Sequence, residues 1–130
     1  MVLAKKVVTR LASLELLPEG VLCIRFHSGM DLDMAGVNEV IEQRVKMAQD
    51  GPLPVMVVLS ATTSSEVRVN ITDFPQQVKD CTLAEATVAP AEYVKRLADL
   101  YYGHHHPAFP SAIFDSEEEA LVWLRGFAAH

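Results

Sequence analysis

Three consecutive histidines, His104, His105 and His106, form a conspicuous group of potential metal ligands. Imidazole nitrogens bind zinc and other transition metals. Structural zinc sites use four protein ligands, whereas catalytic sites use three and a water molecule. Adjacent side chains point in different directions, so at most two of these histidines could bind one ion on a regular backbone. We therefore expect a polar loop here and predict no metal site.

Carboxylates and thiols offer a second route to chemistry. Asp31 and Asp33 bracket the expected start of a helix, where capping accounts for them. The three glutamates at 117–119 suit the positive end of a helix dipole. General acid–base catalysis needs two such groups facing each other in a pocket, and the sequence places no pair in that way. Cys23 lies in an apolar run, where a buried thiol is expected. No glycine-rich phosphate-binding motif occurs, so we predict no catalytic residue, no cofactor and no enzyme activity.

Aromatic side chains concentrate in the last third of the chain. Most should form core between the last two helices and the sheet, but those beside the histidines could be exposed. Exposed rings next to a polar loop suit a protein partner or self-association. The predicted ligand or partner surface comprises Tyr101, Tyr102, His104, His105, His106 and Phe109.

Length and composition bound the class of protein. The 130 residues predict one domain over 1–130, and a chain with 50% hydrophobic and 22% charged residues is typical of globular proteins. A formal net charge of −6 disfavours nucleic acid as a partner. No apolar run reaches the roughly 20 residues that span a bilayer, so no membrane span is predicted. The N-terminal residues lack a secretion signal, so we expect a cytoplasmic protein with reduced cysteines.

Hydrophobic periodicity predicts the elements of the first half. Apolar runs at 7–17 and 21–27 flank a Pro18-Glu19-Gly20 turn and predict a β-hairpin. A helix is expected over 34–48, with an apolar stripe on one face and a polar face that includes Arg44. Residues 54–59 form a continuous apolar run, which is typical of a central strand.

The second half continues in alternation. Residues 60–80 are the least regular, and we expect a short helix beginning near Thr72 or Asp73. A strand follows at 82–89, a helix opened by Pro90, and a strand at 111–114. A final helix is capped by Asp115 or Ser116. The order β-β-α-β-α-β-α-β-α predicts an α/β domain with a mixed, mostly parallel sheet packed with helices.

This order and the end of the chain resemble a known family. Residues 106–124 read HPAFPSAIFDSEEEALVWL. This segment is similar to the "PPFP–strand–F–x–[DS]–EEEAL–x–WL" ending of small bacterial STAS/SEC14-like domains, which are of largely unassigned function. The resemblance covers the whole chain in topology and about the final third in motif. It implies a STAS-like, SpoIIAA-like fold, and it is much less specific for activity.

The resemblance also indicates a modification site. In anti-sigma-factor antagonists of that fold, a partner kinase phosphorylates a serine at a helix start, in a motif resembling Asp-Ser-Ser-Gly. By position, the candidate phosphoacceptors here are Ser64 and Ser65. The preceding Asp and following Gly are absent, and Glu66 would repel an added phosphate. Helix capping or a loop position is the alternative role for these serines.

Together these features predict an uncharacterised, non-catalytic protein-binding or regulatory module whose partner is another protein or a second copy of the chain. The SEC14-like side of the resemblance implies an alternative, a carrier of a small apolar or lipid-like ligand. Four methionines would then provide a pliable lining: Met30, Met34, Met47 and Met56. A metal-dependent enzyme that uses the loop from His104 to His106 ranks last.

Overall fold

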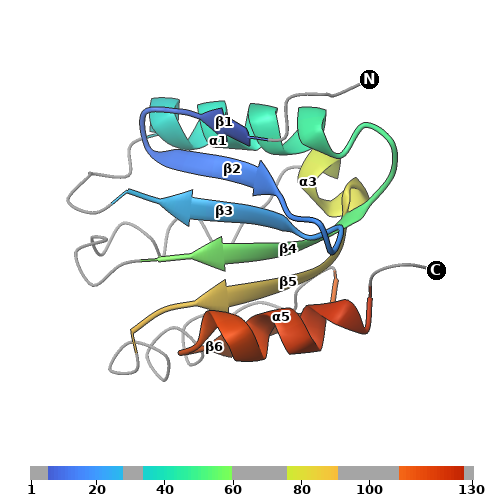
Figure 1. Ribbon diagram of the computed structural model, residues 1–130. Coiled ribbons are helices and arrows are strands. Elements are labelled where there is room, and N and C mark those ends of the chain that lie inside the picture. Colours follow the sequence, from blue (N-terminus) through green and yellow to red (C-terminus); the bar gives the residue numbers. More distant parts are fainter. Residues whose placement is uncertain (1–5, 28–33, 60–75, 91–108, 128–130) are drawn as a thin grey trace.

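Short strands and tight turns build one mixed sheet (Figure 1). The computed structural model describes residues 6–27, 34–59, 76–90 and 109–127. Six strands lie in the order β1-β2-β3-β4-β5-β6. They are β1 (Lys6–Val8), β2 (Ala12–Leu16), β3 (Leu22–Phe26), β4 (Leu53–Val58), β5 (Thr82–Val88) and β6 (Ser111–Phe114). The helices of the described residues are α1 (Met34–Met47), α3 (Gln76–Asp80) and α5 (Glu117–Arg125).

The type of strand pairing changes once across the sheet, from antiparallel to parallel at β3. β1, β2 and β3 pair antiparallel, and β3, β4, β5 and β6 pair parallel. Parallel neighbours need a crossover connection, and α1 provides it between β3 and β4. The predicted α/β class with a mixed, mostly parallel sheet is confirmed.

The first predicted strand is two strands, so the prediction of one continuous strand over 7–17 is wrong. The hydroxyl of Thr9 donates to the carbonyl of Ala12 at 2.9 Å and accepts from its amide at 3.1 Å. These bonds close a tight turn between β1 and β2, and Leu11 within the turn is fully buried. A side-chain hydrogen bond of this kind competes with continued strand pairing. Hydrophobic content alone could not reveal the turn.

The predicted hairpin around Pro18-Glu19-Gly20 is confirmed. β2 and β3 pair from Ala12 opposite Phe26 to Leu16 opposite Leu22. Gly20 closes their connection with φ +85°, a conformation that glycine adopts without steric cost. The amide of Leu17 donates to the carbonyl of Val21 at 2.8 Å, which fixes the register of the two strands.

Helices cover both faces of the sheet. Successive side chains of a strand point to opposite faces, so Val55 and Met56 of β4 enter different cores. The first core packs Val37 and Val40 of α1 against the sheet and also contains Leu11, Leu14, Leu22, Ile24 and Val55. The second packs Ala120 and Leu124 of α5 against Val21, Cys23, Met56, Ala84, Ala86 and Val88. The continuous apolar run of β4 is thus explained by its burial on both faces.

The last helix begins where its sequence indicates. Ser116 is the N-cap, and its hydroxyl accepts from the amide of Glu119 at 3.3 Å. The acidic first turn faces the positive end of the helix dipole. The helix expected in the region before the strand at 82–89 is seen as α3, which begins at Gln76. The start predicted for it, at Thr72 or Asp73, lies outside the described residues, as does the helix expected after Pro90. None of the described helices is long and apolar enough to cross a membrane.

Candidate functional site

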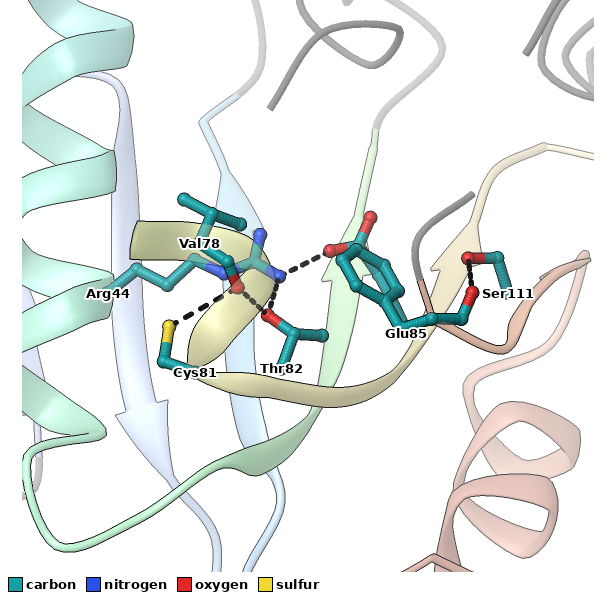
Figure 2. A network of polar contacts seen from close by, with 7 residues as sticks. Arg44, Val78, Cys81, Thr82, Glu85 and Ser111 are labelled. Atoms are coloured by element: carbon teal, nitrogen blue, oxygen red, sulfur yellow. Dashed lines mark hydrogen bonds and ion pairs between the residues drawn. The ribbon is translucent and has the colours of Figure 1, made fainter. Parts of the chain in front are cut away.

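A charged cluster lies buried between α1 and β5 (Figure 2). We call Arg44, Thr82 and Glu85 the buried arginine cluster. The Arg44 side chain reaches from α1, and its Nη2 donates to Glu85 Oε1 at 2.6 Å and to Thr82 Oγ1 at 2.9 Å. These residues are 4%, 6% and 3% exposed in chain order. A charge in such surroundings is tolerated because it is paired and hydrogen-bonded.

The position of Arg44 corrects the prediction that it lies on the solvent face of its helix. Val37, Val40 and Arg44 are three and four residues apart, so they lie on one face of α1, and all three are buried. Arginine is usually a surface residue, and the prediction therefore placed Arg44 on the solvent face of the helix. Its acidic partner lies 41 residues later in the chain. A pairing of that range leaves no local signal.

A β-bulge brings Thr82 and Glu85 to the same side of the sheet. In a regular strand, residues three apart point to opposite faces. Here β5 contains one extra residue against β4, because Leu53 pairs with Thr82 and Pro54 pairs with Ala84. The irregularity turns both side chains toward Arg44. It also lies beside Pro54, which cannot donate a backbone hydrogen bond to a sheet.

The buried arginine cluster is bonded inward to the neighbouring elements. The Thr82 hydroxyl donates to the carbonyl of Val78 in α3 at 2.7 Å, and the Cys81 thiol approaches the same oxygen at 3.5 Å. The backbone amide of Glu85 donates to the carbonyl of Pro110 at 2.9 Å. The cluster therefore links α1, α3, β5 and the entry to β6. Its chemistry is that of a charge-assisted structural pair.

A second ion pair lies at the ends of β3 and α5. Arg25 Nη1 and Nη2 each donate to one carboxylate oxygen of Glu117 at 2.8 Å, which is a bidentate arrangement. We call Arg25, Glu117 and Cys23 the edge cluster. The two charged side chains are 48% and 43% exposed. Hydrogen bonding to Arg25 lowers the pKa of Glu117, and the same bond raises the pKa of Arg25. Both groups stay charged at neutral pH.

The thiol of the edge cluster is held in its protonated form. Cys23 is 4% exposed, so the expected buried thiol is confirmed. Burial raises its pKa and outweighs the opposing effect of Arg25, whose Nη2 lies 3.9 Å from the sulfur. Thiolate is the nucleophilic form of cysteine. A buried thiol with a raised pKa is a poor nucleophile.

An open groove lies along the outer side of α5. It encloses about 380 Å³ and is lined by Ser116, Glu118, Glu119 and Val122. Val122 contributes the apolar part of this lining, and it is 60% exposed. The groove therefore combines an apolar contact with two carboxylates.

Most residues of the predicted sites lie outside the described residues. This applies to both candidate phosphoacceptors, Ser64 and Ser65, and to five residues of the predicted partner surface: Tyr101, Tyr102, His104, His105 and His106. Phe109 is described, and it is 7% exposed, so its ring is not an exposed contact. Among the described residues, no three His, Cys, Asp or Glu side chains come together as metal ligands.

The sequence held a weak signal for the charged residues that it failed to identify. Arg44 interrupts a stripe of apolar residues spaced by four, and Glu85 lies between two alanines in a strand. A charged residue at a core position needs a buried partner of opposite sign. The opposite charges of Arg44 and Glu85 at two such core positions are therefore a signal for their pairing. For Arg25 and Glu117, which lie 92 residues apart on polar surfaces, the sequence offers no comparable signal.

Comparisons with known proteins place the chain in a family. A crystal structure of a protein of unknown function from Arthrobacter sp. FB24 is similar at 24% sequence identity, over 85% of this chain and 90% of that one, with a TM-score of 0.34. No curated protein matches the chain. A family model described as "Domain of unknown function (DUF7793)" matches residues 15–128. That match spans most of the chain, so this protein belongs to the DUF7793 family.

Proposed function

We propose that this protein is a non-catalytic module that binds another protein or a second copy of itself. The observation that carries the proposal is the internal pairing of its reactive side chains. Arg44 with Glu85, and Arg25 with Glu117, each join a helix to the sheet. Charged side chains that pair within the domain stabilise its fold. The folded domain then offers its surface to a partner.

The protonation of the edge cluster supports a non-catalytic role. A general acid works best when its pKa lies near the working pH. The pKa of Glu117 is instead lowered by Arg25, and the pKa of Cys23 is raised by burial. Both shifts move these groups away from acid–base or nucleophilic activity at neutral pH.

Exposed apolar side chains support a binding role. Val8 on the outer strand β1 is 66% exposed, and Val122 beside the groove on α5 is 60% exposed. Their removal from water by a partner would be favourable, at about 25 cal/mol per Å² of apolar area. The groove on α5 adds two carboxylates, Glu118 and Glu119. A partner segment that carries basic and apolar side chains would complement it.

The proposal retains the finer features implied by the resemblance. It includes a STAS-like, SpoIIAA-like fold, for which the antiparallel start of the sheet and the Ser116-capped final helix are compatible features. It also includes the predicted surface at residues 101–109 as a partner contact. In it, Ser64 or Ser65 would switch binding if phosphorylated, by adding negative charge to an already acidic protein.

Site-specific photo-crosslinking in living cells tests this function. A photoreactive phenylalanine derivative would replace Val122 in the groove or Tyr101 in the predicted surface. The matched control carries it at Lys46, which is exposed on α1, and α1 packs on the opposite face of the sheet from α5. We expect one protein adduct of defined mass from at least one of the first two positions. Equal adduct patterns at all three positions, or none at any, would contradict the proposal.

The carrier alternative predicts a different result. Its proposed lining includes Met56, which is 1% exposed and packs in the core under α5, and Met47, which packs against the core under α1. Both therefore contribute to ordinary cores. A small molecule that co-purifies with the chain would favour the carrier over the binding module.

A further inference from the structure

We infer that the buried arginine cluster is a conformational device that holds β5 in its bulged register. The inference is independent of the proposed function. It begins from the extra residue in β5, Leu83, whose side chain is 40% exposed. Bulges in parallel sheets are rare, so a specific interaction is needed to favour this one.

The bulge and the cluster require each other. Arg44 Nη2 contacts both Thr82 and Glu85, which is only achieved when these two side chains share a face. They lie three positions apart, and the extra residue between them supplies the necessary change of face. Both contacts are short, at 2.9 and 2.6 Å, so a partial loss of the bulge would break at least one of them.

Pairing β5 with β4 without the bulge would cost free energy at Glu85. Without the bulge, each side chain of β5 after Thr82 would point to the opposite face of the sheet, because a slip of one residue exchanges the two faces. Glu85 would then point to the core under α5, where Ala120 and Leu124 are fully buried. Its carboxylate would lose Arg44 and meet only apolar neighbours. Leaving a buried charge unpaired in this way is strongly unfavourable.

The intact cluster therefore affects the register of β5 more than it affects the free energy of unfolding. Replacing a buried ion pair by apolar residues is often neutral for stability, while specificity is lost in some systems. Ala84 and Ala86, both fully buried, already show that alanine fits beneath α5. An alanine at position 85 would fit there too. The paired change Arg44→Leu with Glu85→Ala thus removes the part of the penalty on the slipped register that comes from the buried charge.

Nuclear magnetic resonance of this double variant tests the inference. We expect two sets of backbone signals for residues 84–88, one with the Pro54–Ala84 proximity of the native register and one without it. Amide exchange in β5 should be about tenfold faster or more, since the two registers interconvert through an open state. The matched control, Arg25→Leu with Glu117→Ala, removes the other ion pair and should keep one set. A single native set with unchanged exchange in the first variant would overturn the inference.

Deletion of Leu83 tests the effect of the β5 register separately from the effect of the buried charges. It places Thr82 and Glu85 two positions apart, so both would face Arg44 in a regular strand. Added to the double variant, the deletion should restore one set of β5 signals without restoring any charge. In the otherwise native chain it should leave a folded protein whose Arg44–Glu85 contact persists, a result that does not depend on the double variant folding. Doubling that persists after deletion, or a native-background deletion that fails to fold, would overturn the inference.

Discussion

Loss of the Glu85 carboxylate should destabilise the domain strongly. The change Glu85→Gln keeps the size of the side chain but removes the negative charge that faces the buried Arg44 at Glu85. Breaking one side of a buried pair costs about 3 kcal/mol of unfolding free energy. Urea unfolding followed by circular dichroism measures this loss. In the control Glu42→Gln, an exposed i,i+4 pair with Lys46 is broken, and a change below about 0.5 kcal/mol is expected. Equal small effects from both variants would contradict the energetic role of the buried pair.

The pair of Arg25 and Glu117 should contribute a pH-dependent stability. The pKa of Glu117 is lowered from its ordinary value of 4.5, so the folded state binds its proton less readily than the unfolded state. The stabilisation is therefore complete above pH 4.5 and is lost as the pH falls through the lowered folded value. Because both side chains are nearly half exposed, it should be below about 1 kcal/mol.

Comparison of the native protein with Glu117→Gln at two pH values measures this contribution. The native chain should be more stable than the variant at pH 7, and the difference should shrink toward zero as the pH falls below the lowered pKa of Glu117. The Arg25→Ala variant should lose the same dependence on pH. A difference that grows as the pH falls would contradict the assigned sign.

At the scale of elements, the start of α5 depends on its cap. The change Ser116→Ala removes the hydroxyl that accepts from the amide of Glu119, and it should cost about 1 kcal/mol. Thermal unfolding measures the loss. Ser116→Asp keeps an acceptor at the cap and serves as the control, with a much smaller effect. If the two variants were equally destabilised, the hydrogen bond at the cap would not be the cause.

The close contact of α1 with the turn before β2 depends on Gly36. A Cβ at this position would overlap the side chain of Leu11 and lie 2.6 Å from Arg10 Nη2. Leu11 is fully buried in the core under α1. Gly36→Ala should therefore lose about 1 to 3 kcal/mol, although alanine has the higher helix propensity. Asn38→Ala on the exposed side of α1 should be neutral or slightly stabilising. A more stable Gly36→Ala variant would show that the packing is looser than described.

Sequence periodicity was sufficient for most elements and failed where polar groups decide the outcome. The strands at 54–59 and 111–114 and the Ser116 cap were predicted because their signals are local. The turn after Thr9 was missed because one hydroxyl interrupts a run that is otherwise typical of a strand. The bulge at Leu83 was missed because it depends on Arg44, which lies on another element.

At the scale of the whole molecule, the ion pairs tie distant parts of the chain together. Arg44 and Glu85 are 41 residues apart, and Arg25 and Glu117 are 92 apart. The first pair fastens α1 to the sheet and the second fastens α5. Contacts of this range give no periodic signal, so only the apolar neighbours of Arg44 and Glu85 hint at the buried pair, and nothing in the sequence indicates the pairing of Arg25 with Glu117.

Native mass spectrometry of the untagged protein tests the central claim, a non-catalytic module that binds proteins, most directly. It reports bound metals, small molecules, partner proteins and additional copies in one spectrum. The account predicts the polypeptide mass of 14.3 kDa, alone or in a complex with a second copy or another protein. A stoichiometric non-protein mass that survives gentle desolvation and is lost on denaturation would contradict it, and the identity of that mass would indicate a carrier or a metal-dependent enzyme instead.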